Sequence, residues 1–194
     1  PLAGLKASPV PRVPADVLLL GASASSAATA AELGLPYVYA LFINNDEEEA
    51  ARAFEAYRSV FRSAEGRGPE ALLAVPVIVA DTDEEARSIA EQCRIVKIHL
   101  KSGRTITVAT VEHAEEYGRQ AEEEYTIDAR QAYVVHGSKE TVRAQLLEAA
   151  AKYGVEEFIV ISTIRDAAKR LRSYELLKEA FAETPVAGEA VQTL

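Results

Sequence analysis

Short apolar runs alternate with amphipathic segments along most of this chain. The apolar runs predict strands at about residues 17–20, 37–42, 71–80 and 158–163. Between them, apolar residues recur at helical spacing, as in the segment after "NNDEEE", where Ala50, Phe54, Tyr57 and Phe61 fall at i, i+4, i+7 and i+11. Strands that alternate with helices are typical of a parallel α/β sheet with crossover helices. We therefore expect the α/β class.

The helix boundaries carry recognisable capping residues. A helix over 26–34 ends on Gly34, a residue that tolerates the positive φ found just past a helix C-terminus. Thr82 and Glu85 form a capping-box pattern, and Ser138 is a candidate N-cap. The helix after Ser138 has a predicted core face of Val142, Leu146, Ala149 and Tyr153. In the closing helix, 166–183, we expect Leu171, Tyr174 and Leu177 to pack inward and Lys169, Arg170 and Arg172 to face solvent.

Two stretches interrupt the strand–helix alternation. Pro76 divides the apolar run 71–80, so we expect the regular strand on one side of it or a bulge there. Residues 94–108 alternate around a Gly-containing turn, which predicts a β-hairpin, followed by a charged helix at about 111–124 and a short apolar stretch at 132–135. We interpret residues 1–194 as a single domain, with an extended segment at 1–15, a hairpin-and-helix insertion at 94–131 and a tail at 184–194.

Length limits the barrel architectures that the alternation allows. A complete (β/α)8 barrel usually needs roughly 250 residues, and this chain has 194. About four parallel strands with crossover helices correspond to half of such a barrel, and the hairpin is an insertion in it.

Composition excludes several function classes. The net charge of −9 argues against non-specific nucleic-acid binding, which needs a basic face. There is neither an apolar run of 18 residues nor a signal-peptide pattern, so we expect a cytoplasmic protein without membrane partners. The lone Cys93 excludes an intrachain disulfide and is read as a buried core thiol. His99 and His113 have no ligand partner at suitable spacing, so no metal site is predicted.

His136 is a weaker candidate for function. It follows the short apolar stretch and precedes Gly137 and Ser138, a position where barrel enzymes place functional groups. A solvated loop histidine is the alternative. No catalytic residue is assigned from the pattern.

The first strand runs directly into a turn of small residues, "GASASS", at 21–26. A strand that feeds a helix N-terminus presents unpaired N–H groups beyond its carboxyl end, and small side chains let an anion approach them. The pattern indicates a phosphate site with Gly21, Ala22, Ser23, Ser25 and Ser26 as its candidate residues. The alternative is that these serines only cap the helix, with Ser25 or Ser26 as the N-cap.

The segment "DVLLLGASASSAATAAELGLPYVYALF" resembles one found in bacterial luciferase-like flavin-dependent monooxygenases, in the branch of luciferase-family oxidoreductases. Three later segments are similar to the same family in the same order: "ADTDEEAR", "VVHGSKETVRAQL" and "STIRDAAKRLRSYELL". The four segments span residues 16 to about 181, yet they correspond only to the C-terminal half of the family's barrel.

The resemblance implies a (β/α)8 barrel fold that uses reduced FMN and O2, with the turn after the fifth strand holding the flavin phosphate. Carried onto this sequence, Ala22 and Ser23 would offer N–H groups, and Ser23 and Ser26 their hydroxyls, with Ser25 a less secure member. The implied function is a monooxygenase present as a truncated or partial barrel. The alternatives are a non-catalytic module that binds flavin or phosphate, and a structural or interaction role. Half a barrel exposes two sheet edges, so we expect a homo-oligomer or pairing with an N-terminal half-barrel.

Overall fold

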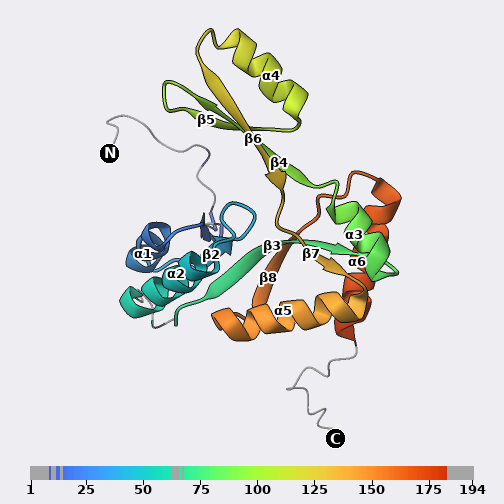
Figure 1. Ribbon diagram of the computed structural model, residues 1–194. Helices are drawn as coiled ribbons and strands as arrows, with labels where there is room; N and C mark the ends of the chain where they lie inside the picture. The colour runs from blue at the N-terminus through green and yellow to red at the C-terminus, as the bar shows by residue number, and fades with distance from the viewer. Residues whose placement is uncertain (1–8, 10–11, 14, 63–65, 67, 183–194) are drawn as a thin grey trace, which may run out of the picture.

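The computed structural model describes residues 9, 12–13, 15–62, 66 and 68–182, which form a parallel α/β body and a smaller antiparallel lobe (Figure 1). The body contains β1 (Leu19–Gly21), α1 (Ala24–Leu33), β2 (Tyr37–Ala40), α2 (Glu47–Val60), β3 (Ala71–Val79), α3 (Asp83–Ala90), β7 (Val135–Gly137), α5 (Lys139–Tyr153), β8 (Glu157–Ile161) and α6 (Ala167–Ala182). The lobe contains β4 (Arg94–Leu100), β5 (Thr105–Val108), α4 (Val111–Gln120) and β6 (Tyr125–Gln131). The extended segment 1–15 lies largely outside the described residues, and the tail 184–194 does so entirely.

The parallel sheet confirms the predicted α/β class. β1 pairs with β2, β2 with β3, and β3 with β8, all in parallel, while β7 pairs with the last part of β3. The four predicted strands are therefore neighbours in the sheet, in chain order. Among the described strands, β1 and β8 each pair on one side only, so they form its two open edges.

The strand β3 runs through Pro76 without a break, contrary to the expectation that proline would interrupt it. β2 pairs with β3 only as far as Ala74, β8 as far as Pro76, and β7 from Val77 onward. Pro76 thus lies where the pairing partner of β3 changes, a position at which a missing N–H is tolerated.

Side chains alternate between the two faces of the sheet, as the pleat requires. Tyr37, Tyr39, Leu73 and Val75 belong to the main core, together with residues of α1, α2, α5 and α6. The opposite face carries a smaller cluster of Val38, Leu72 and Ala74, with Phe42 and Ile161 packed against it. In the described part of the chain, no helix contributes a residue to that second cluster. The helices α1, α2, α5 and α6 therefore cover one face of the sheet, along which Figure 1 shows α1, α2 and α5 arranged. On the other face, α3 packs against Ile78 near the end of β3.

The lobe confirms the predicted hairpin and adds a strand that the pattern missed. β4 and β5 pair antiparallel with Ile98 opposite Ile106, and β6 pairs antiparallel with the other edge of β4. The sequence pattern assigned no element to 125–131, where the structure places the partly buried β6. The short parallel strand β7 also begins later than the apolar stretch 132–135 suggested.

The outward face of α6 corrects a second expectation. Leu171 and Tyr174 are 60% and 44% exposed, whereas Ser173, Leu176 and Ala180 face the core. The hydroxyl of Ser173 accepts a hydrogen bond from the backbone N–H of Val79 at 2.9 Å. This bond satisfies a buried donor at the end of β3, so α6 turns its serine inward.

The residue Cys93 also differs from expectation. It is half-buried rather than a core thiol, because α3 ends at Ala90 and Cys93 follows it outside the helix. None of the helices in the described part of the chain is long and apolar enough to cross a membrane.

Buried tyrosines fill the space between the sheet and its helices. The hydroxyl of Tyr37 donates to the carbonyl of Ser23 at 3.2 Å and lies 3.0 Å from the Ser26 hydroxyl. The hydroxyl of Tyr39 is buried with no hydrogen-bond partner among the described residues. Burial raises the pKa of Tyr39 to about 12, since desolvation disfavours the charged phenolate.

Replacing either tyrosine by phenylalanine should change the free energy of unfolding, in opposite directions at the two positions. Tyr39→Phe removes an unsatisfied buried hydroxyl, so the free energy of unfolding should rise by about 1 kcal/mol, whereas Tyr37→Phe breaks bonds to the α1 turn and should lower it by about 1 kcal/mol. Denaturant unfolding at pH 7 measures both. A Tyr39→Phe variant less stable than the parent would contradict the assignment.

The pH dependence supplies a second measurement on the same pair. The pKa of Tyr39 in the folded state is raised from 10 to about 12. The contribution of this shift to the free energy of unfolding is therefore constant below pH 10 and is lost as the pH rises toward 12. The parent should lose stability over this range, and Tyr39→Phe should lose less.

Candidate functional site

The turn between β1 and α1 is held by its own serines. Ser23, not Ser25 or Ser26, is the N-cap of α1: its hydroxyl accepts from the N–H of Ser26 at 3.3 Å. The Ser26 hydroxyl donates to the carbonyl of Ser23 at 2.8 Å and accepts from the N–H of Ser23 at 3.3 Å, completing a capping box. The N-cap therefore lies at Ser23 and not at Ser25 or Ser26, where the capping alternative expected it. Ser25 is exposed.

Gly21 is required by packing at this turn. A Cβ built on Gly21 would collide with the side chain of Ser26. The close approach of strand and helix that any phosphate site here needs is therefore set by the Gly21–Ser26 contact.

A carboxylate of this chain already lies at the α1 N-terminus. The N–H of Ala24 donates to Glu49 Oε1 at 2.9 Å, and Arg52 bonds Glu49 Oε2 through Nε at 3.1 Å and Nη2 at 2.9 Å. The Ala24 N–H, followed by Arg52, lowers the pKa of the Glu49 carboxyl. The acidic run of Glu47, Glu48 and Glu49 suits the start of a helix. The contact of Glu49 with α1 could not be predicted from it, because that contact depends on the packing of α1 against α2.

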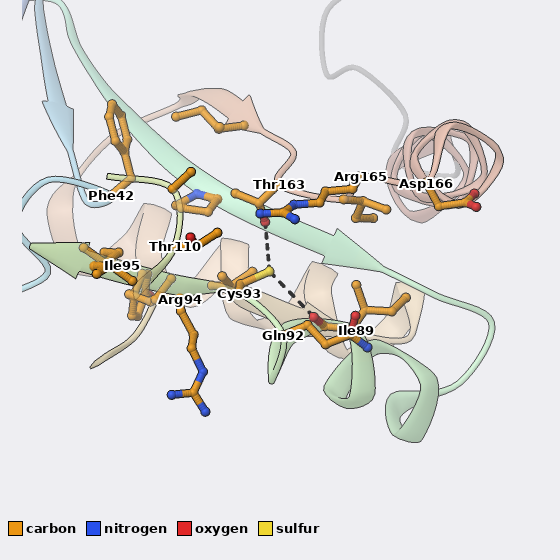
Figure 2. A pocket seen from close by; sticks show the side chains of 18 of the residues that line it. Phe42, Ile89, Gln92, Cys93, Arg94, Ile95, Thr110, Thr163, Arg165 and Asp166 are labelled. Atoms are coloured by element: carbon orange, nitrogen blue, oxygen red, sulfur yellow. Dashed lines mark hydrogen bonds between the residues drawn. The ribbon is translucent and has the colours of Figure 1, made fainter. Parts of the chain in front are cut away.

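A cavity of about 900 Å³ opens between the body and the lobe (Figure 2). Its walls include Phe42, Pro76 and Ile161 from the carboxyl-end half of the sheet. They also include Ile89 at the end of α3, Cys93 in the following loop and Ile95 at the start of β4. Ligand pockets in open α/β sheets lie at the carboxyl ends of the strands. The volume falls within the range of small-molecule and cofactor sites.

The cavity and the turn lie on neighbouring strands. Phe42, which lines the cavity, follows β2, and two residues later the Asn44 side chain donates to the carbonyl of Ala22 at 3.4 Å. Both features therefore stand beyond the carboxyl ends of β1 and β2. This end of the sheet combines an N-terminal helix turn with an apolar chamber.

The polar groups inside the cavity are few. Cys93 Sγ lies 3.2 Å from the Thr163 hydroxyl and 3.6 Å from the carbonyl of Ile89, as the dashed lines in Figure 2 show. Burial raises the pKa of Tyr133, whose side chain also lines the cavity. Arg165 and Lys169 add positive charge at the α6 side. The sequence pattern did not identify Cys93, Thr163 or Tyr133 as site residues, because they come together only through the fold. Arg165 and the basic run that begins at Lys169 could be considered from the sequence as a contact for a phosphate or a partner, with a solvated helix face as the preferred interpretation of the run.

The remaining histidines do not join the cavity. His136 lies on β7, half-buried, with Nδ1 2.9 Å from the carbonyl of Val134, so it is neither a loop residue nor a member of the cavity lining. His99 Nδ1 lies 2.9 Å from the Thr105 hydroxyl in the lobe, and His113 is in α4. Within the described ranges, no group of three or more His, Cys, Asp or Glu residues is placed to hold a metal ion.

Known proteins share both the sequence and the fold. The sequence pattern of the luciferase-like monooxygenases matches residues 1–177. An N-acetyl-S-alkylcysteine monooxygenase of Bacillus subtilis (strain 168) is 36% identical over 167 residues, which cover 84% of this chain and 48% of that protein. The crystal structure of apo-MsnO8 superposes with a TM-score of 0.65 at 36% identity, covering 95% of this chain and 57% of the other.

A more distant structure shares the fold alone. The oxygenating constituent of 3,6-diketocamphane monooxygenase from Pseudomonas putida, in complex with FMN, matches with a TM-score of 0.57 at 17% identity, covering 88% of this chain and 49% of the other. This chain thus spans about half the length of the relatives it matches. The match over 177 residues and the shared fold carry one conclusion: the chain belongs to the luciferase-like monooxygenase family.

Proposed function

We propose that this chain is the C-terminal half of a flavin-dependent monooxygenase barrel, with the FMN phosphate bound at the turn 21–26. The observation that carries the proposal is the position of that turn: it follows β1 directly at the carboxyl end of the sheet and is half-exposed apart from Ser25. Backbone N–H groups at a helix N-terminus and two serine hydroxyls suit a dianionic group. The FMN-bound relative from Pseudomonas putida supports the choice of flavin.

The residues of this chain would bind and shield rather than carry the redox chemistry. Reduced FMN, when bound, supplies the electrons with which O2 is activated for transfer of one oxygen atom to a substrate. Ala22 and Ser23 would offer N–H groups to the phosphate, and Ser23 and Ser26 their hydroxyls. The apolar walls of the cavity, among them Phe42 and Ile161, exclude water from the reacting region.

A non-catalytic flavin-binding module is the second candidate. The observation that favours it is the lining of the cavity, which is mostly apolar and includes few polar groups of this chain. Oxidation of chemically reduced FMN with transfer of oxygen to an organic substrate supports the monooxygenase, and FMN binding without turnover supports the module.

The phosphate role of the turn can be tested without disturbing the helix cap. Ser23→Asp keeps a good N-cap residue but places a negative charge against the phosphate, so the Kd for FMN should rise about tenfold or more while that for riboflavin is unchanged. Fluorescence titration of both flavins measures this.

The same chain offers a matched control for Ser23→Asp. Ser138 is the N-cap of α5, so Ser138→Asp makes the same chemical change at another helix and should leave both flavin affinities unchanged. Equal loss of FMN and riboflavin binding in Ser23→Asp would mean that the turn does not hold the phosphate.

The carboxylate of Glu49 competes with a phosphate for the α1 N-terminus. Glu49→Gln removes a like charge next to the N–H of Ala24, so FMN should bind several-fold to about tenfold more tightly, with riboflavin unaffected. Glu48→Gln is the control, since Glu48 also pairs with Arg52, at 3.5 Å, but bonds no group of α1. Unchanged FMN affinity in Glu49→Gln would place the phosphate elsewhere.

We further propose that two copies of this chain associate through the open sheet edges. Leu20 on β1 and Ile159 on β8 are 49% and 40% exposed, and both alternate with neighbours that pack in the main core, so both lie on the face opposite that core. An exposed apolar edge strand favours association. Because β1 and β8 run parallel, a twofold axis can bring β1 of each copy beside β8 of the other.

Charge reversal tests this pairing of edges. Light scattering at micromolar concentration should give a dimer for the parent and monomers for Leu20→Glu and for Ile159→Lys alone. An equimolar mixture of the two variants should recover a dimer, since one interface then pairs opposite charges. Leu147→Glu on α5, 46% exposed in the parent, is the control and should remain dimeric. A monomeric parent would overturn the proposal.

A further inference from the structure

The guanidinium of Arg165 stands at the cavity without a partner. Arg165 lies in the loop between β8 and α6 and lines the cavity, and in the described part of the chain its side chain makes no hydrogen bond or ion pair. Figure 2 shows this side chain extending across the cavity toward Thr163. A cation held over an apolar chamber is a binding group for an anion.

The other charged residues around the cavity are already engaged or point elsewhere. Lys169 Nζ lies 3.8 Å from Glu85, and the Asp166 carboxylate accepts from the N–H of Lys169 at 2.9 Å, in the first turn of α6. The pKa of Glu112 is lowered by its own backbone N–H and by Thr110 at the start of α4. Figure 2 shows Arg94 directed away from the cavity. Arg165 is therefore the cation that a ligand in the cavity would meet.

The walls that face Arg165 are mostly aliphatic or aromatic. They are contributed by the sheet, the α3–β4 passage and the segments that join the lobe to the body, and include Phe42, Pro76, Ile89, Val134, Ile161 and Ile164. Such a surface accepts an apolar body but offers few hydrogen bonds to it. The ligand that satisfies both features has an apolar portion and one anionic end.

We propose that the cavity binds an organic carboxylate with an apolar chain, and that Arg165 selects it by pairing with the carboxylate. This inference rests on the proposed function in taking the cavity as the substrate chamber. Arg165 acts here as a specificity-determining residue, because it distinguishes an acid from a neutral molecule of the same size. The hydroxyl of Thr163, next to Cys93, lies on the side toward which Arg165 extends and can donate a second hydrogen bond.

The test compares octanoate with octanamide, which differ in charge at one end and share the chain. Calorimetric titration of the full chain at low salt, without flavin, should give an affinity for octanoate about tenfold or more above that for octanamide. In Arg165→Gln this preference should vanish while octanamide binding stays the same. Arg165→Lys, which keeps the charge but not the planar fork, should retain part of it.

Arg94→Gln is the control, since Arg94 also lines the cavity but points away from it, and it should keep the full preference. Titration of FMN and riboflavin into Arg165→Gln separates the two sources of an anion. If Arg165→Gln weakens FMN but not octanoate, the group that meets Arg165 is a flavin phosphate and the inference is wrong. A persisting octanoate preference in Arg165→Gln, or no binding of either probe to the parent, also overturns it.

The experiment distinguishes this inference from the proposed function. Octanoate selection that depends on Arg165 supports the carboxylate site even where FMN fails to bind, in which case the flavin proposal alone is lost. If FMN binds but octanoate is not preferred over octanamide, the flavin proposal stands and the carboxylate inference is wrong.

Discussion

The body of this protein depends on the burial of β3 between its neighbours. β3 pairs with β2 and β8 along its first half and with β7 along its second, and eight of its nine residues are buried. A strand buried on both faces must be apolar throughout, which accounts for "ALLAVPVIV" in place of an alternating pattern. β2, β7 and β8 pair with this strand directly, and β1 is joined to it through β2. The register of β3 therefore sets where the carboxyl ends of the other strands lie relative to one another.

Two helix N-termini at the carboxyl end of the sheet are each bonded by a carboxylate from another helix of the body. Glu49 of α2 accepts from the N–H of Ala24 at α1, and Asp83 of α3 accepts from the N–H of Ser138 at α5, at 2.6 Å. The Ser138 N–H is also the leading cause of the lowered pKa of Asp83. Because the two contacts are alike, we interpret the Glu49 contact as one that holds α1 and α2 together. A ligand at the α1 turn would therefore exchange one anion for another rather than fill an empty site.

Local patterns were enough to predict most elements of the body. Gly34 takes a φ of 65° at the end of α1, and Thr82 and Ser138 cap α3 and α5, because capping depends on a few adjacent residues. Where long-range contacts decide, the pattern was insufficient: apolar periodicity placed Leu171 and Tyr174 inward, but the bond between Ser173 and Val79 turns α6 the other way. β6 was missed for a similar reason, since its mixed sequence is a strand only by pairing with β4.

The candidate site also has one part that the sequence predicts and one that it does not. The turn at Ser23 could be found because its small residues are contiguous. The cavity could not, because the lobe forms it by leaving the body at Cys93 and returning at Ala132, where the N–H of Ala132 donates to the carbonyl of Cys93 at 2.9 Å.

That backbone bond continues the pairing of β4 with β6 and joins two residues that lie far apart in sequence. The cavity opens beside it. The insertion is therefore more than an appendage of the sheet. It supplies Cys93, Ile95 and Thr110 to a chamber whose other wall is the carboxyl end of β2, β3 and β8. Ile95 and Thr110 belong to none of the core clusters of the body, so they can vary without disturbing β3, whereas Cys93 packs against the cluster that contains Ile78 of β3. The parallel sheet and the lobe together form the walls of the cavity, and the β8–α6 loop adds Arg165 to its lining.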